Sequence, residues 1–279
     1  MSLPGNTDEF AAKEVVLVTG STGGLGREVA LALADRDTHV IVHGRDRERG
    51  LEVVGRIEEQ AGGSASFHAA DLASLDEVRT FAETVLARYH RLDVLVNNAG
   101  IWLEPEQGRV VSEDGHELHF QVNYLSHYLL TRRLLPHLVD SAPARIVNVA
   151  SGAQQPLDFD NIMLEHGYSD GRAYAQSKLA QILFTRDLAR ELVGSGVLVT
   201  ALHPATMMDT GMVLSRGARP RSSVEEGVEA VVNLVRGDEV EHGAYYNGLV
   251  QARPHRQAES PEARERLRRL SDELTGLEP

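Results

Sequence analysis

The feature that most constrains the fold is an apolar, β-branched run at 15–19 that leads directly into a glycine-rich segment at 20–26. Helical periodicity follows from 27 to 35. A short buried strand, a glycine-rich turn and a helix in this order form one βα unit. Glycines in such a turn let the backbone approach a pyrophosphate, which the positive N-terminus of the helix attracts. We predict a dinucleotide site here, with a plain glycine turn as the alternative.

Apolar runs and helical periodicities alternate along the rest of the chain. They predict strands at 38–42, 64–70, 94–96, 145–149, 197–202 and 243–246, the last at a sheet edge, and helices at 46–60, 75–89, 117–138, 173–192, 224–235 and 262–274. Strands that alternate with helices form a parallel sheet. The predicted fold is therefore α/β, a single Rossmann-type doubly wound parallel sheet with helices on both faces. We expect a flexible N-terminal arm at 1–13 and a single dinucleotide-binding catalytic domain at 14–279.

Two segments, 152–172 and 207–221, fit this alternation poorly, and each follows a predicted strand. In open α/β sheets, ligands bind beyond the carboxyl ends of the strands. We therefore expect both segments to be substrate loops. The candidate pocket residues are Trp102, Met207, Met208 and Met212. Core packing or loop coverage would explain each of them equally well.

Composition narrows the classes of partner. The 279-residue chain has a formal net charge of −13 and no cysteine. Nucleic acids and anionic membranes attract lysine and arginine, so this charge disfavours both as partners. Without cysteine there are no disulfides, thiol nucleophiles or thiolate metal sites, and the scattered histidines predict no metal site. No apolar run is long enough to span a bilayer, and the first residues lack the apolar core of a secretory signal. We expect a cytoplasmic protein.

The end of the second predicted strand favours one cofactor over another. A carboxylate at this strand tip binds the ribose 2′-hydroxyl of NAD, but here Gly44 takes that place and Arg45 follows. A guanidinium suits a 2′-phosphate, so we predict NADP(H) over NAD(H). Two alternatives stay open, a solvated Arg45 at the start of a charged helix and Asp46 in the NAD-binding role. Asp71, after the third strand, either accepts from the adenine amino group or caps the next helix together with Ser74.

Tyr174 and Lys178 are separated by one helical turn and share a helix face. An ammonium group beside a phenol favours the phenolate, so we expect Lys178 to lower the tyrosine pKa from its usual value of about 10. A tyrosine tuned in this way is a general acid and base. Tyr168 and Arg172 form the alternative pair, but an arginine does not relay protons and Tyr168 stands among turn residues.

Taken together, these motifs resemble the short-chain dehydrogenase/reductase family over residues 15–277. The matching motifs, in the family's order, are Thr19-Gly20-xxx-Gly24-x-Gly26, Asn97-Asn98-Ala99-Gly100, Asn123, Ser151 and Tyr174-xxx-Lys178. Within the family, the stretches 120–124, 177–185 and 201–204 are similar to the retinol-dehydrogenase-like branch. The long interval between Ser151 and Tyr174 is similar to an insertion in that branch.

The resemblance implies roles for the matching residues. Tyr174 would transfer a proton to or from the substrate oxygen, and Lys178 would lower its pKa and bind the nicotinamide ribose. Ser151 would orient the substrate carbonyl. Asn123 would hold a water that links Lys178 to solvent, with a polar core residue as the alternative. The implied cofactor-binding residues are Gly20, Ser21, Thr22, Gly24, Leu25, Gly26, Arg45, Asp71, Leu72, Asn98, Ala99, Gly100, Tyr174, Lys178, Pro204 and Thr206.

The chain departs from the family pattern after Pro204. Ala205 replaces the usual glycine, so we expect the backbone there to avoid positive φ. Asp209 stands where a threonine is usual, and Thr210 comes next. Because a carboxylate near a diphosphate is repulsive, we expect Asp209 to point away from the cofactor.

These observations predict an NADP(H)-dependent oxidoreductase. It would interconvert a carbonyl and an alcohol on an apolar small molecule by hydride transfer, with a tyrosine as acid and base. Two alternatives are a non-catalytic dinucleotide-binding sensor or scaffold, and a reductase of a carbon–carbon double bond. Homo-oligomer formation stays open, because members of the family often pair their long helices.

Overall fold

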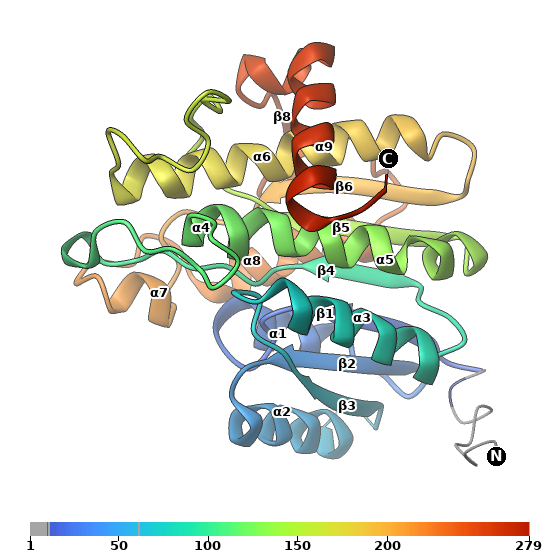
Figure 1. The fold of residues 1–279 in the computed structure, drawn as a ribbon. Helices are drawn as coiled ribbons and strands as arrows, with labels where there is room; N and C mark the ends of the chain where they lie inside the picture. The colour runs from blue at the N-terminus through green and yellow to red at the C-terminus, as the bar shows by residue number, and fades with distance from the viewer. Residues whose placement is uncertain (1–9, 11, 61, 279) are drawn as a thin grey trace.

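The computed structural model describes residues 10, 12–60 and 62–278. They form an eight-stranded sheet in the order β3-β2-β1-β4-β5-β6-β7-β8 (Figure 1). All neighbouring strands run parallel except β8, which is antiparallel to β7. The strands are β1 (Glu14–Val18), β2 (Thr38–Gly44), β3 (Ser64–Ala69), β4 (Val94–Asn97), β5 (Ala144–Val149), β6 (Val197–His203), β7 (Tyr245–Asn247) and β8 (Val250–Ala252). The predicted α/β fold with one Rossmann-type sheet is confirmed.

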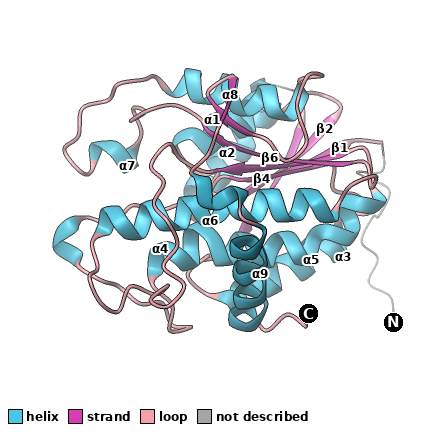
Figure 2. Ribbon diagram, turned by 90° about the horizontal axis from the view of Figure 1, so that it is seen from above, coloured by secondary structure: helices cyan, strands magenta, loops and turns pink. Residues whose placement is uncertain are grey.

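Helices cover both faces of the sheet (Figure 2). One face carries α1 (Gly24–Leu33), α2 (Arg47–Gln60) and α8 (Val224–Arg236), and the other carries α3 (Leu75–Arg88), α5 (Ser126–Asp140) and α6 (Asp170–Glu191). Because both faces are covered, the central strands read as continuous apolar runs, and every residue of 15–18 is buried. The strand order reverses between β1 and β4. Ligands of such sheets bind at this switch point.

The helix predicted at 117–138 contains an irregular turn. It begins as α4 (Leu118–Phe120), widens into a π-helical turn at Gln121–Leu125, and continues as α5. A π-helical turn inserts an extra residue into the helix and is frequent at functional sites. Here it surrounds the fully buried Asn123. Hydrophobic periodicity does not distinguish a π-helical turn from a regular one.

The carboxyl-terminal part differs most from the prediction. The strand expected at the edge, β7, is paired on both sides, and β8 forms the edge instead. A short helix, α7 (Gly211–Leu214), interrupts the second predicted loop. The last helix, α9 (Pro261–Thr275), crosses α6 and lies beside α5 (Figure 1). The Tyr124 hydroxyl is 2.6 Å from Ser271 Oγ, and this contact holds α9 against the helices on that face of the sheet.

The beginning of the chain bears on the predicted N-terminal arm. Residues 1–9 and 11 of that arm lie outside the described residues. Phe10 is buried, and its ring centroid lies 4.0 Å from that of His39 and 5.3 Å from that of Tyr89. The packed domain therefore includes a side chain that precedes residue 14.

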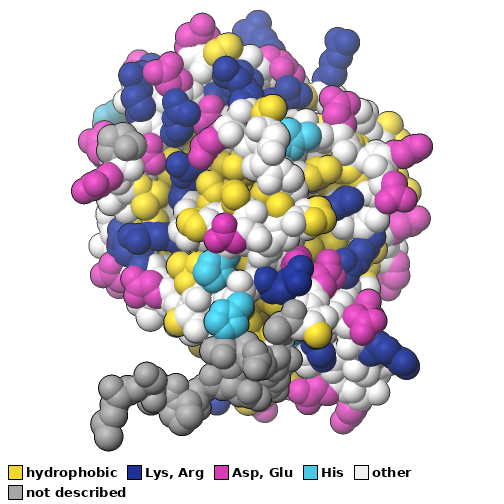
Figure 3. Space-filling view, turned by 90° about the vertical axis from the view of Figure 1, so that its right-hand side faces the viewer, with side chains coloured by type: hydrophobic (Ala, Val, Ile, Leu, Met, Phe, Trp, Pro, Cys, Tyr) yellow, Lys and Arg dark blue, Asp and Glu magenta, His cyan; other side chains and the backbone are white. Residues whose placement is uncertain are grey.

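The charge distribution on the surface and the apolarity of the helices concern the expected absence of nucleic-acid and membrane partners. On the face shown in Figure 3, lysine and arginine side chains are interspersed with aspartate and glutamate, and neither sign gathers into one patch. In the described part of the chain, none of the helices combines the length and apolarity that crossing a membrane requires. Within the same residues, no three histidine, aspartate or glutamate side chains come together as a candidate metal site.

Candidate active site

A cavity of about 940 Å³ opens at the carboxyl ends of the central strands. Most of the predicted cofactor-binding residues line it, and they come from the loops after β1, β2, β3, β4 and β6, from the first turn of α1 and from α6. These residues are Gly20, Thr22, Gly24, Leu25, Gly26, Arg45, Asp71, Leu72, Asn98, Ala99, Gly100, Tyr174, Lys178, Pro204 and Thr206. Ser151 lines it as well. The topology therefore joins segments that are far apart in the sequence.

The glycine-rich loop fits a dinucleotide because side chains are excluded from it. Gly20 has φ +65°, and a Cβ there would lie 2.8 Å from the Ala99 Cα. A Cβ on Gly26 would lie 2.4 Å from Asn98 Nδ2 and from the carbonyl oxygen of Gly20. Asn98 Nδ2 also donates to the carbonyl oxygen of Thr19 at 2.8 Å, as expected for an asparagine that ties strand ends together. The loop thus leads to the N-terminus of α1, which favours the phosphates of a dinucleotide.

The position of the Ser21 side chain does not support the predicted contact with the cofactor. Its side chain is fully buried and is not part of the cavity lining. Ser21 Oγ donates to the carbonyl oxygen of Val18 at 2.7 Å and accepts from the backbone nitrogen of His43 at 3.0 Å. Ser21 therefore fixes the glycine-rich loop to the ends of β1 and β2.

The adenosine end of the cavity carries an arginine and an aspartate. Arg45 Nη1 lies 3.5 Å from Asp71 Oδ2, and the Arg45 side chain is 70% exposed. A Cβ on Gly44 would lie 2.6 Å from Thr22 Cγ2, so a carboxylate side chain has no room at this strand tip. Ser74 is the N-cap of α3 and accepts a hydrogen bond from the backbone nitrogen of Glu77, and Asp114 Oδ2 accepts from the backbone nitrogen of Leu75 at 2.9 Å. Asp71 Oδ1 accepts from the backbone nitrogen of Ala73 at 2.9 Å, so Asp71 orders the turn before α3 but bonds no nitrogen of the helix itself.

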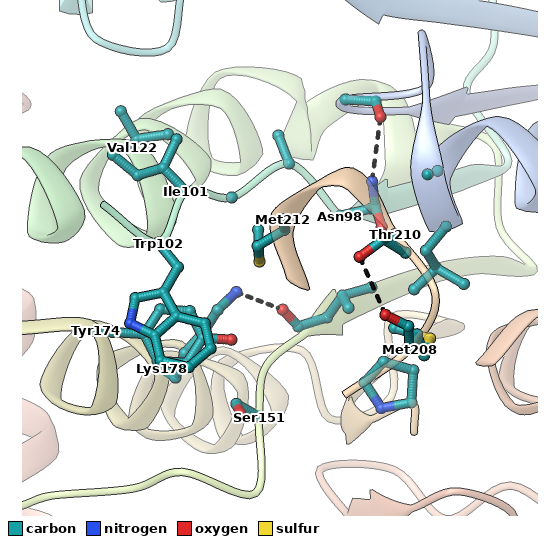
Figure 4. A pocket seen from close by; sticks show the side chains of 18 of the residues that line it. Asn98, Ile101, Trp102, Val122, Ser151, Tyr174, Lys178, Met208, Thr210 and Met212 are labelled. Carbon is teal, nitrogen blue, oxygen red and sulfur yellow. Dashed lines mark hydrogen bonds between the residues drawn. The ribbon is translucent and has the colours of Figure 1, made fainter. Parts of the chain in front are cut away.

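Three predicted catalytic side chains meet in the middle of the cavity (Figure 4). Ser151 follows β5, and its hydroxyl group is close enough to that of Tyr174 to affect the tyrosine pKa. Tyr174 and Lys178 lie one turn apart on α6, with Lys178 Nζ 5.8 Å from the centroid of the tyrosine ring. Lys178 Nζ donates to the carbonyl oxygen of Val149 at 2.9 Å and to Gln181 Oε1 at 3.0 Å. The arrangement places two hydroxyl groups and a buried amine at one point of the cavity wall.

Comparison with known proteins agrees with this geometry. Residues 14–220 match the short chain dehydrogenase family. The chain belongs to this family. It is an oxidoreductase that acts on an alcohol or a carbonyl group with NAD(P). The predicted resemblance to the retinol-dehydrogenase-like branch is confirmed by curated relatives.

One relative and two solved structures illustrate the likeness. Human retinol dehydrogenase 13 is 36% identical over an alignment of 297 positions, gaps included. The alignment covers 99% of this chain and 86% of the human protein. An uncharacterised protein from Mycobacterium paratuberculosis has a TM-score of 0.78 at 28% identity, over 99% of this chain and 96% of its own. The Pseudomonas aeruginosa RhlG/NADP active-site complex has a TM-score of 0.68 at 27% identity, over 85% and 94% of the two chains.

The protonation of this dehydrogenase's site differs from the sequence-based expectation. Burial raises the pKa of Tyr174 above its usual value, and the neighbouring Ser151 hydroxyl only partly opposes this. Burial also lowers the pKa of Lys178 to about 7. The expected lowering of the tyrosine pKa by a charged lysine is therefore not what this structure gives. Near neutral pH the phenol is protonated, which is the form that donates a proton to a carbonyl oxygen.

Asn123 lies behind the catalytic side chains and is not part of the cavity lining. Its Oδ1 accepts from the backbone nitrogen of Ile101 at 2.8 Å, and its Nδ2 donates to the Ile101 carbonyl oxygen at 3.1 Å and to Ser177 Oγ at 3.0 Å. These bonds fit the alternative of a polar core residue bonded to backbone. The role of holding a water for Lys178 stays a prediction.

The buried Lys178 predicts a pH dependence of stability. Its pKa falls from 10.5 in the unfolded chain to about 7 in the fold, so between these values the unfolded state binds a proton that the native state does not. The free energy of unfolding should therefore rise with pH across this interval, by up to about 1.4 kcal/mol per pH unit. Lys178→Met should remove that slope. Urea unfolding of the cofactor-free protein at several pH values between 7 and 10 measures it.

The control for this prediction is Lys13→Met, because Lys13 is the chain's only other lysine. This variant should keep the slope of the parent protein. Parallel curves for the parent protein and Lys178→Met over the same pH range would contradict the buried, neutral state of Lys178.

Only one of the two predicted substrate loops lines the substrate end of the cavity along much of its length. From 152–172, only residues at its two ends line the cavity. The middle of this segment binds the carboxyl-terminal region, where the backbone nitrogen of Leu157 donates to Gln257 Oε1 at 2.6 Å. The second predicted loop lines the cavity as expected, and residues 101–103 after β4 line it too. The apolar lining residues of this end include Ile101, Trp102, Leu103, Met207, Met208 and Met212. The four residues proposed from the sequence as pocket candidates are all among the lining.

The loop after β6 contains the residues at which the chain departs from the family pattern, and the structure shows where each of them lies. Ala205 is not among the residues with positive φ, as expected, but Met207 has φ +52°. A positive φ strains a side-chain-bearing residue and often marks a functional segment. Asp209 lies outside the main cavity and lines a second one with Arg27. Thr210, which the sequence-based site did not include, lines the main cavity and lies 3.7 Å from the position of a Cβ on Gly24.

Proposed function

We propose that this dehydrogenase uses NADP(H) to interconvert a carbonyl and an alcohol on an apolar small molecule, with Tyr174 as the proton donor and acceptor. The convergence of Ser151, Tyr174 and the buried Lys178 on one cavity carries the proposal. The likeness to a retinol dehydrogenase and the apolar lining around Trp102 support an apolar substrate. A cytoplasmic location is part of the proposal, supported by the net charge of −13 and the absence of cysteine. Recovery of the protein with membranes after cell fractionation would contradict that location.

The cofactor and each of the site residues have a separate role in the proposed reaction. A nicotinamide cofactor, when bound, supplies the hydride or takes it up. Ser151 and Tyr174 hold the substrate oxygen between two hydroxyl groups, where negative charge develops during reduction. Tyr174 then donates its proton to that oxygen. Lys178, whose pKa of about 7 lies near the working pH, is placed to return a proton to the tyrosine.

NADP(H) is favoured over NAD(H) by the strand tip of β2. Thr22 fills the space that an acidic side chain from Gly44 would need to bind the 2′-hydroxyl of NAD. Arg45 lines the cavity beside it and is mostly exposed, so its guanidinium is available to a 2′-phosphate. Asp71 is the counter-ion that the phosphate would displace or share.

Replacing Arg45 by alanine should therefore weaken NADPH binding and leave NADH binding nearly unchanged. A hydrogen bond between charged groups contributes about 1.5–3 kcal/mol, so the dissociation constant for NADPH should rise roughly tenfold to a hundredfold. Titration of both cofactors by calorimetry measures the change. Arg49→Ala is the matched control, because Arg49 lies close to Arg45 in the sequence, in the first turn of α2, and pairs with Asp46 outside the cavity. Equal losses for NADPH and NADH in Arg45→Ala would contradict the assignment.

The activity is tested by following NADPH oxidation with a panel of apolar aldehydes and ketones. Steady oxidation with formation of the alcohol supports the proposed reaction. Tight NADPH binding without turnover of any carbonyl would favour the alternative of a non-catalytic dinucleotide sensor.

A further inference from the structure

The phenol ring of Tyr174 is covered by the indole of Trp102 (Figure 4). Their ring centroids are 5.2 Å apart, and the planes are inclined by 30°. On the indole, Arg216 Cζ lies 4.0 Å from the ring centroid, a favourable distance for a cation–π contact. None of the described residues accepts a hydrogen bond from the buried Trp102 Nε1. The indole is therefore held by ring contacts rather than by its N–H group.

Buried polar side chains fix the backbone on both sides of the indole. Asn123 binds both the backbone nitrogen and the carbonyl oxygen of Ile101. The backbone nitrogen of Leu103 donates to His119 Nε2 at 3.1 Å, and His119 Nδ1 lies 2.8 Å from Glu117 Oε1. Both nitrogens of the His119 ring are thus occupied, so this histidine–glutamate pair positions the loop rather than acting on a substrate.

Arg216 joins this loop to the catalytic helix. Its guanidinium donates to the carbonyl oxygen of Leu103, and Nη2 lies 2.8 Å from Asp170 Oδ2. The side chains of Arg216 and Asp170 are only 12% and 20% exposed, so water screens this ion pair less than a surface pair. Asp170 is the first residue of α6, one turn before Tyr174. The segment after α7 therefore sets the position of the indole over the tyrosine.

We propose that Trp102, held over Tyr174 by Arg216, selects the substrate by the size of the group attached to its carbonyl carbon. This inference rests on the proposed function. A carbonyl oxygen that reaches Ser151 and Tyr174 brings the substituents of its carbon beside the indole. Met208 and Met212 line the same cavity with flexible side chains that adapt to different shapes. The indole, in contrast, is held in place, so it limits the size of the substrate group that fits beside it.

The contact with Arg216 is tested by fluorescence, because Trp102 is the chain's only tryptophan. In Arg216→Ala, the acrylamide quenching constant of the cofactor-free protein should rise severalfold, since the indole loses its cation and becomes accessible. Arg219→Ala is the matched control, because Arg219 is an exposed arginine in the same segment. Its quenching should equal that of the parent protein. Unchanged quenching in Arg216→Ala would overturn the role of Arg216.

The selection by size is tested by kinetics. Trp102→Ala should raise kcat/KM for a branched ketone relative to a short unbranched one by roughly tenfold, the scale of steric discrimination by one pocket wall. The dissociation constant for NADPH should not change. Trp102→Phe, which keeps an aromatic ring, should restore most of the parent preference, and its thermal unfolding reports whether the fold is kept. An unchanged substrate preference in Trp102→Ala would overturn the proposal.

The two readouts separate this inference from the function on which it rests. Absence of turnover in the parent protein with every carbonyl would overturn both the proposed function and the selection role. The fluorescence comparison would still decide whether Arg216 holds the indole. Turnover by the parent protein with unchanged preference in Trp102→Ala would overturn the selection role alone.

Discussion

Replacing Tyr174 by phenylalanine should lower kcat by about 10²–10⁴-fold, the range that general acid and base groups contribute. The variant keeps the ring that stacks on Trp102 and loses only the hydroxyl group next to Ser151. The cavity wall should therefore stay in place. The dissociation constant for NADPH should change little, since one hydroxyl is removed from a large contact surface. Steady-state kinetics together with cofactor titration measures both quantities.

Tyr168→Phe is the matched control for this prediction. Tyr168 precedes α6 by two residues, and its hydroxyl is buried away from the main cavity. Burial raises the pKa of Tyr168 to about 12. Tyr168 does not line the cavity that contains Ser151, Tyr174 and Lys178, so its hydroxyl group is not placed to exchange a proton with the substrate. This variant should keep the parent turnover. Full activity in Tyr174→Phe, or equal losses in the two variants, would contradict the role of Tyr174.

Ser151→Ala should lower kcat by about 10²–10³-fold, the scale seen when one preorganised donor to a developing oxyanion is removed. Ser151 Oγ also accepts from the backbone nitrogen of Ala153 at 3.1 Å, which keeps its hydroxyl fixed at the end of β5. Ser151→Thr keeps a hydroxyl and should recover part of the lost rate.

The double variant of Ser151 and Tyr174 gives a sharper result. Because the two hydroxyl groups are neighbours in the cavity and would face one substrate oxygen, their contributions should not add. The loss in Ser151→Ala with Tyr174→Phe should be well below the product of the single losses. Strict multiplication of the two effects would show that the two side chains act on different steps.

The parallel core was predictable because burial on both sides requires continuous apolar strands. Val15 and Leu17 face one layer of helices while Val16 and Val18 face the other, and the run is apolar throughout. The edge strand β8 was missed because it has three residues and Val250 is 71% exposed, which leaves no burial pattern to read. The π-helical turn around Asn123 was missed because one extra residue per turn does not change local composition.

The sequence allowed the residues of the site to be predicted, but not the burial of these residues or the pKa values that result from it. Ser151, Tyr174 and Lys178 do lie together, since Ser151 follows β5 and the first turns of α6 bring Tyr174 and Lys178 to the same cavity. The raised pKa of Tyr174 depends on burial among residues from several segments, which spacing along one helix does not reveal. The course of 152–172 depends on contacts with residues about a hundred positions later, such as Leu157 with Gln257. Contacts of this range have no local signal.

One signal for the site was present in the composition. The chain has two lysines and 26 arginines, so a lysine within a buried helix face stands out. An arginine at position 178 would stay charged, whereas a buried lysine can lose its proton near neutral pH. The choice of lysine at this position fits a group that exchanges protons.

The most direct test of the proposed reaction follows deuterium from NADPH labelled at nicotinamide C4 into an α,β-unsaturated aldehyde. This substrate offers a carbonyl and a carbon–carbon double bond in one molecule, and mass spectrometry with NMR locates the label. The account predicts deuterium on the carbinol carbon of an unsaturated alcohol, with Tyr174→Phe slowing its appearance by the factor given above. Deuterium on the β-carbon of a saturated aldehyde would contradict it.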